Sequence, residues 1–166
     1  MEEDWILYSP SVMYSVSLLI RLLSQPHDKV LTMNPMYDAF INVIKENDRE
    51  LLSHHLIKEK GTFKIDFDVF EKQAQESTLL LLCAPHNPTG RIWSDEEMRR
   101  MIEICKKYQV KIISDEIHMD IRIKDAKHHP LMKYYGEYKD IFTASSSSKT
   151  LNTPGLIGSY AVSYTH

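Results

Sequence analysis

The sequence predicts an α/β fold, a three-layer α/β/α sandwich built around a mainly parallel mixed sheet. Short apolar runs of strand length alternate along the chain with segments of roughly 10–15 residues that have helical spacing. Such alternation is typical of crossover units, in which a helix connects two parallel neighbouring strands. The run over residues 77–83 contains four consecutive leucines, which indicates a strand buried on both faces of a parallel sheet.

Length and composition predict one soluble globular domain. The chain has 166 residues and a net charge of −3, and it contains no long basic run, so nothing indicates nucleic acid as a partner. Cys83 and Cys105 fall in an apolar run and in a helical pattern, which predicts buried thiols and no disulfide in a cytoplasmic protein. The first residues are acidic, and no apolar stretch reaches the roughly 20 residues that span a bilayer, so we expect no membrane partner.

The first half of the chain begins with a helix over residues 12–23, for which Ser11 is a candidate N-cap. Apolar residues recur in this segment at the spacing of one helix face. The elements expected next are a strand over 29–33, a turn at Asn34 and Pro35, a helix over 36–46, a strand over 50–54 and a helix over 66–75 capped near Asp66.

The second half contains a capping box, in which Ser94 precedes Glu97 by three residues and predicts a helix that runs to about Tyr108. The elements expected around it are strands over 79–83, 110–114, 141–144 and 157–162, and a short helix over 131–135.

Polar side chains follow three of these strands at the point where each strand ends. Asn87 follows the leucine strand, Asp115 follows the 110–114 strand, and Lys149 follows the 141–144 strand within a run of serines. Ligands of open parallel sheets bind beyond the carboxyl ends of the strands. We therefore expect an amide, a carboxylate and an amine in one crevice, where the amine of Lys149 is a candidate for Schiff-base formation with a carbonyl.

The ordered motifs resemble those of the fold-type I pyridoxal-phosphate enzymes, the aminotransferase class I/II superfamily. The motifs are Pro-x-Tyr at 35–37, Asn-Pro-Thr-Gly at 87–90, Ser-Asp-Glu at 114–116 and Ser-x-Ser-Lys-Thr at 146–150. The spacings of 28 residues (115 − 87) and 34 residues (149 − 115) are also similar to those of the family. The resemblance covers nearly the whole chain, from residue 11 to about residue 162.

The resemblance implies pyridoxal 5'-phosphate (PLP) as the cofactor and assigns a role to each strand-end residue. Lys149 would hold the cofactor as a Schiff base and move the α-proton of an amino-acid substrate. Asp115 would pair with the pyridinium nitrogen, and Asn87 would donate to the phenolate oxygen. Tyr37 would stack on the ring.

The cofactor phosphate would lie at the start of the first helix, as it does in the family. Backbone N–H groups of Val12 and Met13 and the hydroxyls of Ser146 and Ser148 are the expected donors. Many relatives carry an arginine eight residues after the lysine, but that position is Ile157 here (149 + 8).

His118 favours one branch of the superfamily. Aminotransferases commonly have tyrosine three residues after the aspartate, and the sequence around His118 resembles the cystathionine β-lyase type of C–S lyase instead. The resemblance therefore implies α,β-elimination of a thioether amino acid to a thiol, pyruvate and ammonia. A class I/II aminotransferase and an inactive fragment that retains only the fold are the alternatives. His118 is counted among the cofactor-binding residues, and its role is left open.

The resemblance also places residues 1–166 in the central part of the cofactor-binding large domain, without the N-terminal arm and the small domain. Family members form homodimers whose active sites lie at the subunit interface. We therefore expect a homo-oligomer, with apolar surface left open at Trp5, Ile6 and Leu7 and along the final strand. Negligible lyase activity is expected of the isolated chain.

Overall fold

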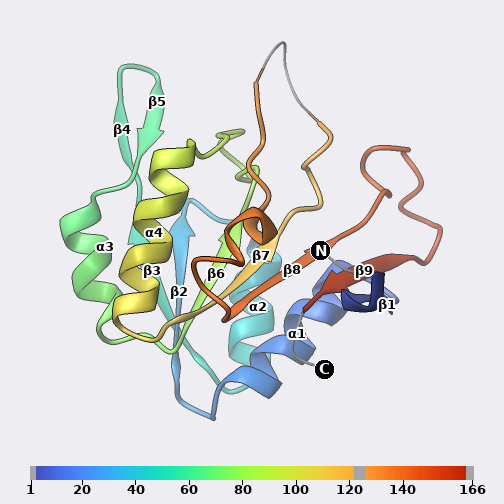
Figure 1. Ribbon diagram of the computed structural model, residues 1–166, viewed down its shortest axis with the longest axis horizontal. Coiled ribbons are helices and arrows are strands. Elements are labelled where there is room, and N and C mark those ends of the chain that lie inside the picture. The colour runs from blue at the N-terminus through green and yellow to red at the C-terminus, as the bar shows by residue number, and fades with distance from the viewer. Residues whose placement is uncertain (1–2, 122–125, 164–166) are drawn as a thin grey trace.

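A seven-stranded sheet forms the centre of the protein in a computed structural model, which describes residues 3–121 and 126–163 (Figure 1). The strand order is β1-β9-β8-β7-β6-β2-β3. Neighbouring strands from β3 to β8 are parallel, whereas β9 runs antiparallel to both β8 and β1. The strands of this sheet are β1 (Ile6–Ser9), β2 (Lys29–Asn34), β3 (Glu50–His55), β6 (Leu79–Cys83), β7 (Lys111–Asp115), β8 (Ile141–Ser145) and β9 (Ser159–Val162).

Helices cover both faces of the sheet and complete the predicted three layers (Figure 1). Helices α1 (Val12–Leu23) and α2 (Asp38–Glu46) lie on one face, and α3 (Phe67–Ala74), α4 (Asp95–Lys107) and the 3-10 helix η2 (Leu131–Tyr134) lie on the other. In β6, Leu79 and Leu81 pack in the core under α1 and α2, while Leu80 and Leu82 pack in the core under α3 and α4. This alternation confirms that the leucine run is a strand buried on both faces.

Side chains at the helix starts form the predicted caps. The Ser11 hydroxyl accepts the backbone N–H of Tyr14 at 3.1 Å. Asp66 accepts two backbone N–H groups at the start of α3. Ser94 and Glu97 make both hydrogen bonds of a capping box. Each cap satisfies donors that a helix start leaves without an intrahelical partner.

Several features differ from the sequence-based expectation. Strand β9 begins at Ser159 rather than at residue 157, and none of its residues is exposed. Helix α2 begins at Asp38 rather than at residue 36, because Tyr37 has extended backbone and forms the N-cap. Strand β1 and the hairpin of β4 (Ile57–Glu59) and β5 (Thr62–Lys64) were not expected, since strands of three or four residues are too short for periodicity to reveal. The hairpin turns at Gly61, whose φ of +80° suits glycine.

The N-terminal segment leaves less apolar surface open than expected, although part of it is exposed. Trp5 is half-buried, with its ring centroid 4.9 Å from that of Tyr135. Ile6 and Leu7 are exposed, as predicted, on the edge strand β1.

Within the described residues, no helix combines the length and the apolar character needed to cross a membrane.

The burial of β6 on both faces of the sheet leads to a prediction about the free energy of unfolding. Leu81→Ala removes a fully buried side chain from β6 and should lower the free energy of unfolding by about 2–5 kcal/mol. Leu22→Ala is the matched control, because Leu22 lies on α1 with 69% of its surface exposed, and it should change that energy by about 0.5 kcal/mol or less. Urea unfolding measures both, and equal effects would contradict the assigned packing.

Candidate active site

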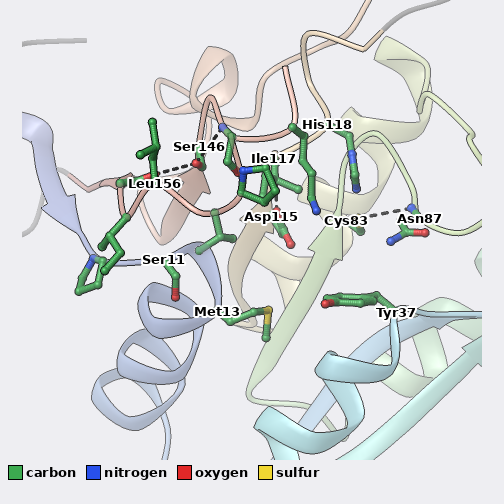
Figure 2. A pocket seen from close by; sticks show the side chains of 17 residues that line it. Ser11, Met13, Tyr37, Cys83, Asn87, Asp115, Ile117, His118, Ser146 and Leu156 are labelled. Carbon is green, nitrogen blue, oxygen red and sulfur yellow. Dashed lines mark hydrogen bonds between the residues drawn. The ribbon is translucent and has the colours of Figure 1, made fainter. Parts of the chain in front are cut away.

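A cavity of about 400 Å³ lies beyond the carboxyl ends of the central strands and is bordered by the start of α1 (Figure 2). Its lining includes every residue that the sequence indicated for a cofactor site. These residues are Val12, Met13, Tyr37, Asn87, Asp115, His118, Ser146, Ser148 and Lys149.

The register of three parallel strands brings the strand-end residues together. Cys83, Asp115 and Ala144 are direct neighbours across β6, β7 and β8. The pairing continues one residue further, where the N–H of Ala84 donates to the carbonyl of Asp115 at 2.9 Å, and that of Glu116 donates to the carbonyl of Ala144 at 2.8 Å. Asp115 is therefore held between the segments that lead to Asn87 and to Lys149.

Asp115 carries a buried carboxyl group at the end of β7. Its side chain is 4% exposed, and Oδ1 accepts the backbone N–H of Ile117 at 3.0 Å. Within residues 3–121 and 126–163 it forms no ion pair. Burial raises its pKa to about 6 against the opposing effect of the Ile117 hydrogen bond, and the nearby Glu116 contributes in the same direction as burial. A cation beside Asp115 would offset this penalty.

Asn87 and Tyr37 border the same space as Asp115, and Figure 2 shows the three side chains converging on it. The backbone N–H of Asn87 donates to the sulfur of Cys83 at 3.4 Å, and its side-chain amide forms no hydrogen bond with any described residue. The Tyr37 ring packs edge-on against Phe40 and keeps 45% of its surface exposed. An amide and an aromatic face are thus available to a ligand.

Lys149 and His118 supply the amine and the imidazole of the cavity. Lys149 lies in a helical turn after β8, which is closed by the hydrogen bond from the N–H of Leu151 to the carbonyl of Ser147 at 2.9 Å. Its exposed side chain forms no ion pair with any described residue. His118 is half-buried, and burial, aided by the Lys149 ammonium, lowers its pKa. Its imidazole is therefore neutral at neutral pH.

Serine hydroxyls hold the start of α1 against the sheet at the edge of the cavity. The hydroxyl of Ser15 donates to that of Ser9 at 2.7 Å, and the hydroxyl of Ser159 donates to the Ser9 carbonyl at 2.9 Å. Because Ser11 caps Tyr14, the N–H groups of Val12 and Met13 are the orphan donors of the helix start. Together with the helix dipole they favour an anion.

The two serines beside the lysine differ in what they offer. The hydroxyl of Ser146 donates to the carbonyl of Gly158 at 2.7 Å and accepts the N–H of Ser148 at 3.1 Å. Its single proton is thus already used. The hydroxyl of Ser148 has no partner among the described residues and is free to donate to a ligand.

Cys83 also lines the cavity, although sequence reasoning treated it only as a core residue. It ends β6 directly opposite Asp115, and its thiol donates to the carbonyl of Pro85 at 3.2 Å. Burial and, to a smaller extent, Asp115 raise its pKa to about 12, so it remains a neutral thiol. The alternation of β6 could have revealed this position, because Cys83 shares a face with Leu79 and Leu81.

Comparison with known proteins identifies similar sequences and structures over almost the whole chain. The chain is 35% identical over 154 residues to cystathionine beta-lyase PatB of Bacillus subtilis. The aligned segment covers 91% of this chain and 40% of PatB. It superimposes on the PLP-bound C–S lyase from Staphylococcus hominis with a TM-score of 0.95 and 32% identity, over 98% of this chain and 43% of that one. Cystalysin from Treponema denticola, whose structure contains pyridoxal 5'-phosphate, gives a TM-score of 0.95 and 29% identity, over 99% of this chain and 42% of that one.

The matches cover nearly all of this chain but less than half of each known protein. The chain spans about two fifths of the length of the relatives it matches, 40% in the case of PatB. The sequence model of the family "Aminotransferase class I and II" matches residues 2–164. The chain belongs to the aminotransferase class I and II family.

Proposed function

We propose that the chain provides the PLP-binding site of a C–S β-lyase similar to cystathionine β-lyase. The convergence of Asn87, Asp115 and Lys149 in one cavity carries the proposal, and the similarity to PatB and to the S. hominis C–S lyase supports it. In the reaction, the C–S bond breaks with its electron pair on sulfur, and the thioether amino acid and water give a thiol, pyruvate and ammonia.

The residues of the cavity fit PLP, as the chemistry of the donors indicates. The buried carboxylate of Asp115, which forms no ion pair with any described residue, suits the protonated ring nitrogen. The N–H groups of Val12 and Met13 and the hydroxyl of Ser148 suit a phosphate. Tyr37 offers a partly exposed ring for stacking, and Asn87 offers a free amide to the phenolate oxygen.

Three residues of the cavity have a defined task in this proposal. When bound, PLP takes up the electron pair that remains after the α-proton of the substrate is removed. Lys149 would hold the cofactor covalently through its Nζ atom, and the same amine would remove that proton. Asp115 would hold a proton at the ring nitrogen, and Asn87 would donate to the phenolate oxygen.

A class I/II aminotransferase is the alternative, favoured by the family match itself. An aminotransferase would return the proton to the cofactor and would need a keto acid to complete each cycle, whereas elimination needs none. An inactive chain that retains only the fold is the third possibility.

We also infer a homodimer in the cytoplasm. The exposed apolar side chains of Ile6, Leu7 and Tyr8 on the edge strand β1 support self-association, because surface of this kind marks interaction sites. Two buried free thiols, Cys83 and Cys105, support a reducing compartment.

The first functional prediction concerns Lys149. Addition of PLP followed by borohydride should label Lys149, because its amine alone among the described lysines lines the cavity. Mass spectrometry of peptides locates the label. Lys149→Arg should abolish it, while Lys72→Arg on the exposed surface of α3 should leave it unchanged. Label spread over surface lysines in the parent chain would contradict a formed site.

The second prediction concerns Asp115 and pH in the chain without cofactor. Below its ordinary pKa of 3.8 the carboxyl is neutral in both folded and unfolded states. Between 3.8 and about 6 the folded state binds the proton more tightly, so the free energy of unfolding falls as pH rises. Above about pH 6 the decrease in the free energy of unfolding is complete and amounts to on the order of 2–3 kcal/mol.

Asp115→Asn removes this loss, so the variant should be more stable than the parent at about pH 7.5, with the difference shrinking towards about pH 4. Urea unfolding across this range measures it. The same variant should bind PLP more weakly, because the ring nitrogen loses its partner. Asp68→Asn on the exposed start of α3 is the control. A variant less stable than the parent at neutral pH would overturn the assigned burial cost.

The third prediction separates the lyase from the aminotransferase. A chimera in which this chain replaces its matching segment of PatB supplies the rest of the family fold. With cystathionine and no keto acid, it should release pyruvate, and Lys149→Ala in the same chimera should not. Amino transfer that strictly requires a keto acid would establish the alternative, and PLP absorbance of the purified chimera verifies that the site is assembled.

A further inference from the structure

The turn that carries Lys149 is weakly packed against the rest of the protein. It belongs to the loop between β8 and β9, and most residues from 147 to 157 are exposed. The base of this loop is closed by the hydroxyl of Ser146, which donates to the carbonyl of Gly158 at 2.7 Å. Because little of the loop is buried, its position depends on hydrogen bonds rather than on apolar packing.

A hydrogen bond connects this turn to the turn that follows β7. The hydroxyl of Thr150, the residue after Lys149, donates to Oδ2 of Asp120 at 3.0 Å. Asp120 follows His118 by two residues, and neither Asp120 nor Thr150 lines the cavity that Lys149 and His118 share. A carboxylate acceptor makes the hydrogen bond stronger than one between neutral groups. The bond therefore joins two cavity-lining turns from outside the cavity.

The turn after β7 is itself anchored to the fold by Glu116. The side chain of Glu116 is almost completely buried, Oε1 accepts the N–H of Leu131 at 2.8 Å, and Oε2 lies 3.2 Å from Nε2 of His128. The N–H of Met119 donates to the carbonyl of Glu116 at 2.9 Å and closes the turn. Asp120 thus follows an anchored turn and offers the loop of Lys149 a fixed acceptor.

We propose that Asp120 and Thr150 are positioning residues, whose hydrogen bond holds the amine of Lys149 in the cavity. The inference rests on the proposed function for the role of that amine, whereas the position of the amine is a property of the chain without cofactor. An amine reacts with a carbonyl only when the two groups meet in a productive geometry. Loss of one hydrogen bond should change the fraction of correctly placed amine by about twofold to tenfold.

The imidazole of His118 reports the position of the amine in the chain without cofactor. Burial and, after it, the Lys149 ammonium lower the pKa of His118 from its ordinary value of 6.5. Thr150→Val removes the hydroxyl and leaves every charge in place. If the amine moves away, the pKa of His118 should rise by about 0.3, a twofold change in its proton-binding constant. NMR titration measures this pKa, and the imidazole resonance that His118→Gln removes identifies the group.

Three comparisons separate positioning from a general loss of structure. Thr150→Ser keeps a hydroxyl and should leave the pKa of His118 within about 0.1 of the parent value. Thr153→Val is the matched control in the same loop, because the hydroxyl of Thr153 forms no hydrogen bond with any described residue. In a Lys149→Gln background, Thr150→Val should have no effect, since the displaced charge is absent. An equal rise in that background would show that the burial of His118 had changed instead, and it would overturn the inference.

The rate of covalent PLP attachment is the second measurement. Borohydride trapping at timed intervals measures how fast Lys149 is labelled, and Thr150→Val should slow the labelling about threefold. Thr150→Ser should restore the parent rate. In an Asp120→Ala background, Thr150→Val should have no further effect, because the bond is already lost.

The outcomes separate the inference from the function on which it rests. An unchanged pKa of His118 in Thr150→Val overturns the inference and leaves the proposed cofactor site intact, as does an unchanged labelling rate in a chain that takes up PLP. The expected rise of the pKa in a chain that does not take up PLP supports the positioning of Lys149 and overturns the proposed function. If Thr150→Val fails to fold, Thr150→Ala takes its place in both measurements.

Discussion

The burial of Asp115 at the end of β7 is the constraint on which the site depends. Parallel pairing with β6 and β8 places its carboxylate at the shared edge of the sheet, where the residue is buried. In the chain without cofactor, burial disfavours the charged form and raises the pKa of Asp115. A cationic ligand that relieves this cost would bind the folded state preferentially, which is the physical basis of the role proposed for Asp115.

The same sheet edge organises the rest of the site around that carboxylate. The end of β6 leads to Asn87, the end of β8 leads to Lys149, and β1 delivers the start of α1. The lining of this cavity thus brings together an amide, a carboxyl group, an imidazole and an amine at one edge of the sheet.

Much of this arrangement could be predicted from local patterns. The leucine run and the caps at Ser11 and Ser94 have short-range causes, and the structure confirms them. The nine candidate residues lie in one cavity because strand ends of a parallel sheet share an edge, although their roles towards PLP stay a prediction. Strand β1 and the β4–β5 hairpin escaped prediction, since three or four residues carry too little periodicity.

The sequence by itself determined the identity and order of the reactive groups, the helix starts and the strand buried on both faces, because these depend on residue type and on spacing along the chain. Only the tertiary structure decided that Asp115 is buried and forms no ion pair with any described residue, that Cys83 is its neighbour on β6, and that Ser146 uses its proton on Gly158. Burial and adjacency arise from contacts between distant segments, and no local pattern encodes which segments will meet.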